Sequence, residues 1–285
     1  MLAEPGLLSR SWRNLAGSSA IVIASMCWVL IVIVCALAGS WLAPHSPTAQ
    51  DLSTGMTMPS GSHWLGTTKL GTDVFSIVIA GTRTAVVGPA LIAIGAMVGG
   101  SALGLIAGYV GGRVESLILR WVDFMYALPG LIVAIVVVGV IGGGYWMAVI
   151  TITVLSVPFD TRVVRSAVLT QRHLHYVEAG EMLGISRWRI LFREIWPNVM
   201  PLELAQAFLS FSSALVTLAS LSFLGLGVAP GTPDWGLLLS VSYPDLANNP
   251  FASIGPGLAI VLTSAAVNVV GDWIYESFSD RGRAR

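Results

Sequence analysis

Charged residues are scarce in this sequence of 285 residues. They make up 11% of the chain, against 55% hydrophobic residues, and the mean hydropathy is +0.79. A soluble domain has about 25% charged residues, so a chain this apolar would leave far too much apolar surface in water. The formal net charge is zero, which offers nothing to attract a nucleic acid, and we expect no such partner. The composition predicts a membrane protein.

Cysteine is also rare, and Cys27 and Cys35 both lie inside one apolar run. Residues eight apart on a helix are separated by about 12 Å along its axis, which is too far for a disulfide bond. We therefore expect no disulfide, and the two cysteines indicate no redox compartment.

Catalytic and phosphate-binding motifs are missing. Lys69 is the only lysine and is followed by Leu70, so the Gly-x4-Gly-Lys-Ser/Thr loop is absent. No Gly-x-Ser-x-Gly motif occurs either. His173 and His175 are two residues apart, a spacing that turns side chains away from each other on a helix. We expect no enzymatic activity, no metal site and no cofactor in this chain.

Six apolar stretches are long enough to cross the roughly 30 Å hydrocarbon layer as helices. We predict spans at residues 19–42, 84–109, 124–141, 145–164, 201–224 and 254–274. The first stretch exceeds the 7–15 residues of a signal-peptide core, so we expect it to be retained. Pro158 predicts a kink in the fourth span. The predicted fold is an all-α, polytopic membrane protein with about six transmembrane helices.

Basic residues predict the orientation, because they stay on the cytoplasmic side. If the tail of residues 1–18 is inside, only Lys69 and Arg83 of the fifteen basic residues lie outside. We therefore expect both termini and the charged loop 165–197 to be cytoplasmic, and the polar segments 44–82 and 225–252 to face outward.

No predicted span has a charge at its centre. The acidic residues nearest the spans lie near predicted span ends: Asp123, Asp160, Glu203 and Asp272. Proton-driven carriers place charges deep in the membrane, at about 2.5–3.5 kcal/mol each on insertion scales. The pattern disfavours a self-contained, proton-driven carrier, which remains the alternative to a subunit driven by a partner.

The cytoplasmic loop reads YVEAGEMLGISRWRILFREIWPNVMP from Tyr176. Glu178, Ala179 and Gly180 begin a short helix that Gly184 can close in a left-handed conformation. Because its small residues do not protrude, this short helix can fit into a cleft of another protein.

A second helix is predicted to follow, capped by Ser186 and ended by Pro197. Four apolar residues, spaced i, i+3, i+4 and i+7, form one predicted stripe: Trp188, Leu191, Phe192 and Ile195. Such a helix is typical of the membrane interface, where it lies beneath lipid headgroups.

This loop resembles that of the inner-membrane permease subunits of binding-protein-dependent ABC importers. Their loop reads Glu-Ala-Ala-x3-Gly, followed by Ile-x-Leu-Pro, ahead of the penultimate span. Glu178, Ala179 and Gly184 match in register, whereas Gly180 replaces the second alanine and Trp196 precedes the proline.

Three further blocks resemble the dipeptide, oligopeptide and nickel permeases of that family: residues 63–86, 220–236 and 256–272. Gly71-Thr72-Asp73 stands where the family usually has Gly-Arg-Asp. The length and short outer loops are similar to those of the C-type subunit in a two-permease pair.

The resemblance implies a type I ABC importer permease fold over residues 19–285, in a bacterial inner membrane. It implies a second permease, two ATP-binding subunits that hold the ATP and Mg, and an extracytoplasmic solute-binding protein. The implied cargo is a dipeptide or oligopeptide, with nickel chelates and haem-like ligands as alternatives.

The resemblance also assigns the short helix of the loop to ATPase docking. The candidate docking residues are Glu178, Ala179, Gly180 and Gly184, followed by Tyr176, Met182, Leu183 and Arg187.

Small residues in the second span predict close helix packing, within this chain or against the partner permease: Gly95, Gly99, Gly100, Gly104 and Gly108. Polar residues in the last two spans are candidates for the path, unless they bond back to their own helices: Asn268, Ser210, Ser212, Ser213 and Thr217. Outer residues are candidate contacts for the binding protein, unless they serve local packing: Trp64, Asp73, Asp234 and Trp235.

Overall fold

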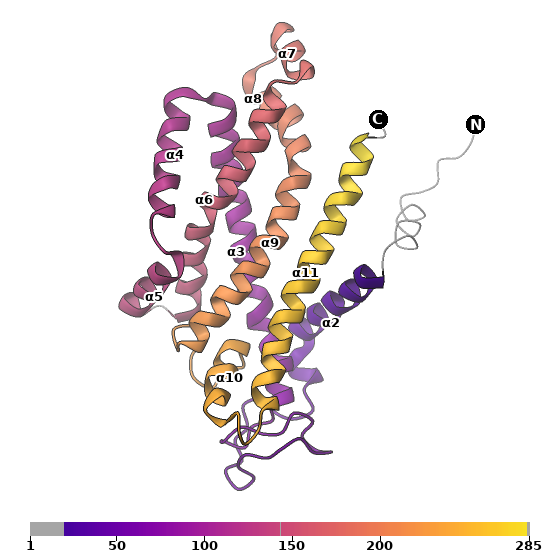
Figure 1. The fold of residues 1–285 in the computed structure, drawn as a ribbon, viewed down its shortest axis with the longest axis vertical. Helices are drawn as coiled ribbons and strands as arrows, with labels where there is room; N and C mark the ends of the chain where they lie inside the picture. The colour runs from indigo at the N-terminus through magenta and orange to yellow at the C-terminus, as the bar shows by residue number, and fades with distance from the viewer. Residues whose placement is uncertain (1–19, 143, 284–285) are drawn as a thin grey trace, which may run out of the picture.

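The computed structural model describes residues 20–142 and 144–283, and within these all regular elements are helices (Figure 1). One isolated bridge pairs Thr67 with Asp73. The helices are α2 (Ala20–Leu42), α3 (Val74–Val110), α4 (Gly112–Tyr126), α5 (Gly130–Ile141), α6 (Gly144–Arg172), α7 (His175–Met182), α8 (Arg187–Ile190), a π-helical turn (Leu191–Ile195), α9 (Trp196–Phe223), α10 (Trp235–Ser242), a 3-10 turn (Tyr243–Asp245) and α11 (Phe251–Arg283). The expected all-α fold is confirmed.

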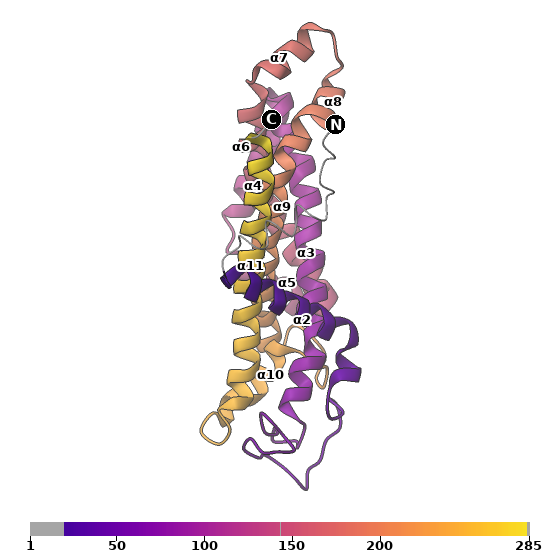
Figure 2. The ribbon, with the colours of Figure 1, turned by 90° about the vertical axis from the view of Figure 1, so that its right-hand side faces the viewer.

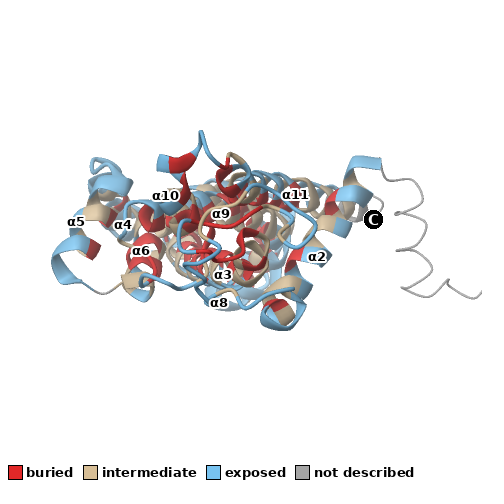
Figure 3. Cartoon of the chain, turned by 90° about the horizontal axis from the view of Figure 1, so that it is seen from below, coloured by how far each residue is buried: buried red, intermediate tan, exposed pale blue. Residues whose placement is uncertain are grey.

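Long helices α3, α6, α9 and α11 form the centre of the bundle, because α3 packs against α6 and α9, and α9 packs against α11. Seen from below, buried residues gather where α3, α6 and α9 meet (Figure 3). Among the described residues, five helices are long and apolar enough to cross a membrane, or six if the bent pair α4–α5 is one span. This agrees with the expected number of about six.

Helix α2 lies obliquely across the outside of the bundle, against α3 and α11 (Figures 1 and 2). Its Trp28 donates a hydrogen bond of 3.2 Å from Nε1 to Thr263 Oγ1 of α11. Most of its apolar side chains are exposed, among them Leu37 and Trp41. An apolar surface of this kind is typical of a helix that contacts lipid.

The predicted third span, 124–141, is not one continuous helix. It is broken between α4 and α5, whose axes differ by 78°. Pro129 caps α5 and disfavours the helical conformation for Leu128 before it. Asp123 and Arg120 belong to α4, a helix that begins well before the predicted span, at Gly112. The predicted span 124–141 is thus interrupted at this proline.

Several other boundaries also differ from the prediction. Helix α3 begins at Val74, so the polar segment that we predicted to face outward ends at residue 73 rather than 82. Helix α6 continues to Arg172, and α11 extends from Phe251 to Arg283. Polar residues at these ends concealed the extensions, because a hydrophobic run marks only the part of a helix that suits lipid.

We predicted that Pro197 ends the second loop helix, but the helix continues through it. The helical path is continuous from Arg187 to Phe223, and Pro197 lies in the first turn of α9. Ahead of it, the Trp196 N–H bonds to the Leu191 carbonyl in the wider π-helical turn. A π turn and a first-turn position both accommodate a missing N–H, so the helix passes through the proline.

The two polar segments meet at the end of the bundle opposite α7 (Figure 1). Asn249 Nδ2 donates to the carbonyl oxygens of Thr57 and Leu65, at 3.2 and 3.1 Å. Lys69 Nζ lies 3.0 Å from Asp245 Oδ1. Residues 43–73 are therefore held against the segment between α10 and α11.

Candidate functional site

Helix α7 stands at one end of the molecule, beyond the ends of α6 and α9 (Figures 1 and 2). Its inner face is formed by Val177 and Gly180, which are both buried. Val177 belongs to an apolar cluster that joins α3, α6 and the start of the 187–223 helix: Leu105, Val164, Val168, Val177, Ile190, Leu191, Ile195 and Val199. The short helix is thus seated on the bundle.

Gly180 faces this cluster, not a docking partner. A Cβ added at Gly180 would lie 3.5 Å from Ile190 Cδ1, an ordinary van der Waals contact. Gly180 therefore packs within the chain, and its contribution to docking stays a prediction. The site has room for an alanine, the residue that the family loop has there.

The outer face of α7 carries exposed residues. Glu178 and Ala179 are exposed, and Met182 and Leu183 at the tip have exposed fractions of 87% and 79%. Tyr176 lies on the inner side, where its hydroxyl donates to Gln171 Oε1 at 2.8 Å. Large apolar side chains this exposed, at the polar end of a bundle, are typical of a surface that another protein covers.

Gly184 closes α7 as predicted, with φ +71°. The Ile185 N–H bonds to the Gly180 carbonyl at 3.1 Å, and the Gly184 N–H bonds to the Glu181 carbonyl at 3.0 Å. This pair of bonds is the Schellman motif, which needs a left-handed residue where Gly184 lies. Ser186 is at the N-cap of α8, but its side chain makes no capping bond there.

The predicted apolar stripe of the second loop helix is divided. Leu191 and Ile195 are buried in the cluster beneath α7, whereas Trp188 and Phe192 are exposed and stack with ring centroids 6.1 Å apart. Exposed aromatic side chains near a helix end are typical of the membrane–water interface. Arg187 opens this helix and is exposed.

Two arginines of α6 form ion pairs with acidic residues of α4. Arg165 makes an ion pair with Glu115 of α4. Arg162 bonds to Asp123 at 2.5 Å, and its guanidinium lies 4.0 Å from the centroid of the Tyr126 ring. These contacts join α4 and α6, so the platform under α7 consists of several connected helices.

The row of glycines in α3 faces α6 of the same chain. A Cβ at Gly104 would lie 2.7 Å from Val164 Cβ, and one at Gly108 would lie 2.8 Å from Val168 Cβ. The other three glycines have close neighbours on the same helix: Gly95 against Thr153, Gly99 against Val157 and Gly100 against Asp160. Of the two alternatives left open by the sequence, the structure supports packing within the chain.

A cavity of about 420 Å³ lies between the α4–α5 break, α6 and α9. Of the candidate path residues, Ser210 and Ser213 line it. Asn268 is absent from its wall and instead accepts a bond of 2.7 Å from Ser212 Oγ, which joins α11 to α9. Thr217 donates back to the Ser213 carbonyl of its own helix. The bond of Thr217 to its own helix matches the alternative that the sequence left open, and a role of Asn268 and Thr217 in the path stays a prediction.

Asp160 is a residue whose position the sequence analysis missed. The extension of α6 places it in the interior of the helix rather than near an end, with an exposed fraction of 2%. Ser210 Oγ, from the cavity wall, lies 3.3 Å from Asp160 Oδ1, and Oδ2 has no hydrogen-bond partner within the described residues. An acidic side chain buried inside a membrane-spanning helix is itself a functional signal.

Three of the four candidate contacts for a binding protein are buried. Asp73 caps α3 through the Ser76 N–H, at 2.8 Å. Asp234 caps α10, and Trp235 Nε1 donates to the Val78 carbonyl at 2.8 Å. These side chains serve local packing, which is the alternative that the sequence left open. Only Trp64 of the four is exposed, at 62%.

Hydrogen bonds also explain why the pKa of Asp73 lies below its ordinary value. Burial raises the pKa of this carboxyl, but the bonds from Ser76 and His63 outweigh burial and hold the pKa below its ordinary value.

Comparisons with known proteins agree with this geometry. Residues 100–283 match the family described as "Binding-protein-dependent transport system inner membrane component". The di/tripeptide transport system permease protein DppC of Pseudomonas aeruginosa is 34% identical over 98% of this chain and 94% of its own length. The glutathione transport system permease protein GsiD of Pectobacterium atrosepticum is 34% identical, over 95% and 90%.

Two further similarities extend this result. The probable D,D-dipeptide transport system permease protein DdpC of Escherichia coli is 32% identical over 90% of this chain and 86% of its own length. An inward-facing structure of the MetNI methionine ABC transporter has a chain that is similar in fold, with a TM-score of 0.59 and 17% identity, covering 70% of this chain and 95% of that chain. The family resemblance predicted from the loop and the three blocks is confirmed.

Proposed function

This chain belongs to the family of binding-protein-dependent transport system inner membrane components, and from that membership we propose that it is one of two permease subunits in an ATP-driven peptide importer. The three relatives named above are permeases for dipeptides, tripeptides or glutathione, itself a peptide. This shared chemistry favours peptide cargo over nickel chelates or haem-like ligands.

The coupling element is α7. The observation that carries this proposal is its two-sided construction, with Val177 and Gly180 buried against the bundle while Met182 and Leu183 are exposed at the tip. An ATPase that encloses the tip moves α7, and the packed inner face passes that movement to α3, α6 and α9. ATP binding would in this way bias a two-state change of the permease.

The end of the bundle that carries α7 is cytoplasmic in this proposal. Arg113, Arg172 and Arg187 lie at the helix junctions of this end, whereas Lys69 belongs to the opposite end. Basic residues are retained on the cytoplasmic side. The delivery of cargo by a solute-binding protein then takes place at the opposite end, near Trp64.

The cargo path includes the cavity between the α4–α5 break, α6 and α9. The wall is mostly apolar, and its hydrogen-bonding side chains are Tyr126, Ser156, Gln206, Ser210 and Ser213. A mostly apolar wall with a small number of polar groups is typical of a ligand-binding pocket. The second permease subunit would close the open side.

The docking role is tested with Met182→Asp and Leu183→Asp in the assembled transporter. Each change adds a charge where an ATPase cleft would bury an apolar side chain, so each should reduce ATPase co-purification and peptide uptake by about tenfold or more, a loss of at least 1.4 kcal/mol. His173→Asp, a change of an exposed residue outside α7, is the matched control. Full ATPase retention and full uptake in both tip variants would show that α7 is not the docking element.

A further inference from the structure

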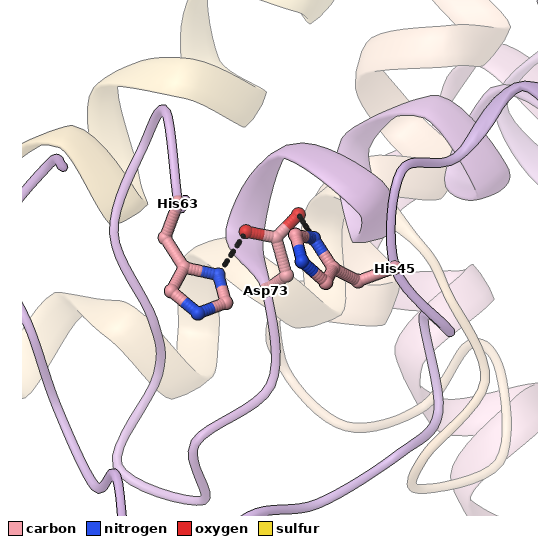
Figure 4. A group of neighbouring side chains, drawn as sticks. All are labelled: His45, His63 and Asp73. Carbon is pink, nitrogen blue, oxygen red and sulfur yellow. Dashed lines mark hydrogen bonds and ion pairs between the residues drawn. The ribbon is translucent and has the colours of Figure 1, made fainter. Parts of the chain in front are cut away.

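Three side chains from different parts of the outer segment converge at the start of α3 (Figure 4). His45 follows α2, His63 lies in the middle of the segment, and Asp73 is the N-cap of α3. His63 Nδ1 lies 2.8 Å from Asp73 Oδ1, and His45 Nδ1 lies 3.8 Å from Asp73 Oδ2. One potential ligand atom from each residue lies within 4.8 Å of the others. Neither the coupling helix nor the cargo cavity uses this cluster.

The distances suit a small, tetrahedral cation. Zinc–nitrogen and zinc–oxygen bonds of about 2.0–2.2 Å place the ligand atoms of a tetrahedral site about 3.3 Å apart. His63 Nδ1 lies 2.8 Å from Asp73 Oδ1, somewhat closer than this value, whereas His45 Nδ1 lies 3.8 Å from the other carboxylate oxygen, Oδ2. One ligand atom from each of the three residues lies within 4.8 Å of the others, somewhat wider than the spacing in a tetrahedral site. Small rotations of the two imidazole rings would therefore bring all three ligand atoms to one ion.

The chemistry of the ligands selects the class of cation. Two imidazoles with one carboxylate suit Zn²⁺ and its neighbours among the divalent transition metals, whereas Ca²⁺ and Mg²⁺ prefer sites made of oxygen atoms alone. The exposed fractions of the side chains rise from 3% for Asp73 to 21% for His63 and 44% for His45. One side of the cluster is therefore open to solvent, from which an ion and a fourth, non-protein ligand can enter.

Surrounding hydrogen bonds hold the ligands in place. Asp73 Oδ2 accepts bonds from the Ser76 N–H and hydroxyl, at 2.8 and 2.6 Å, which directs Oδ1 toward His63. The His45 N–H donates to the same Ser76 hydroxyl at 3.0 Å. Groups of this kind orient the ligands of metal sites before the ion binds. Ser76 thus connects the carboxylate to the backbone of one of the histidines.

We propose that His45, His63 and Asp73 form a binding site for a divalent transition-metal ion of the Zn²⁺ class. The bound ion links the chain after α2, the middle of the outer segment and the N-cap of α3. It stabilises the outer segment against unfolding. The site does not depend on the cargo or on the ATPase partners of this chain.

The experiment is calorimetric titration of the full-length chain, purified with its partner subunits, stripped with EDTA and titrated with ZnCl2. A streptavidin-binding tag replaces any polyhistidine tag, so that added histidines do not bind the ion. We expect one saturable site, an increase in thermal stability with Zn²⁺, and the visible absorption of tetrahedral Co²⁺ when Co²⁺ replaces Zn²⁺.

His45→Gln and His63→Gln should each weaken Zn²⁺ binding by at least about tenfold, and His173→Gln should leave it unchanged. His45 is partly exposed, so its variant should unfold at the same temperature as the unmodified chain when EDTA is present. The absence of saturable Zn²⁺ binding, or unchanged affinity in both cluster variants, overturns the proposal. Because the readout is binding, a failure of peptide uptake has no bearing on it.

Discussion

Adding a methyl group should destabilise the chain at one helical glycine, Gly104, but not at another, Gly180. At Gly104, the new Cβ would lie 2.7 Å from Val164 Cβ and 2.8 Å from the Thr161 carbonyl oxygen. Carbon atoms prefer separations of about 3.5–4.0 Å, so Gly104→Ala must push α3 and α6 apart. Overpacking of this kind costs about 1–3 kcal/mol.

At Gly180, by contrast, the new Cβ would lie 3.5 Å from the Ile190 side chain. This is ordinary contact, and alanine is preferred over glycine in a helix by about 1 kcal/mol. Gly180→Ala should therefore be neutral or stabilising. The two variants should differ by about 1–4 kcal/mol, with Gly104→Ala unfolding at the lower temperature.

The assay is thermal unfolding of both variants and the parent chain in one lipid or detergent preparation, followed by tryptophan fluorescence. Gly130→Ala is the control, because a Cβ there meets nothing within 4 Å and the φ of Gly130 is not positive. If Gly104→Ala unfolds with the parent chain, the close α3–α6 contact is not the constraint inferred from the structure.

Three further predictions concern the caps and the platform. Gly184→Ala, at φ +71°, should lower the stability of the α7 end by about 1–2 kcal/mol and weaken ATPase co-purification. Gly231→Ala, at φ +85° in the segment between α9 and α10, is the control: it should have the same backbone cost and keep the ATPases bound. Asp234→Ala removes the N-cap of α10 and should lower stability by about 1 kcal/mol, measured by thermal unfolding. Arg165→Met and Glu115→Gln should each destabilise the chain, and the double variant should lose less than the sum, as a double-mutant cycle would show for a direct ion pair.

The break between α4 and α5 at Pro129 could not be predicted from the hydrophobic run alone. The apolar residues 124–141 are continuous, so a count of apolar residues predicts one span. The Leu128-Pro129-Gly130 sequence carried a local signal for a helix boundary, and it outweighed the hydrophobic run. Pro197 had the opposite outcome, because the π turn before it let the helix continue.

Structural features that depend on residues close together in the sequence could be predicted from the sequence alone. The apolar spans follow from the energetics of the lipid layer, and the left-handed Gly184 follows from local turn chemistry. The family resemblance, carried by short motifs in order, also needed no coordinates.

Only the tertiary structure decided which side of each helix meets which neighbour. Gly180 faces the bundle, the α3 glycines face α6, and Asp160 is buried beside the cavity. His45, His63 and Asp73 are brought together by the path of the outer segment. Such contacts join residues far apart along the chain, and they are fixed by packing between helices, which no local pattern in the sequence encodes.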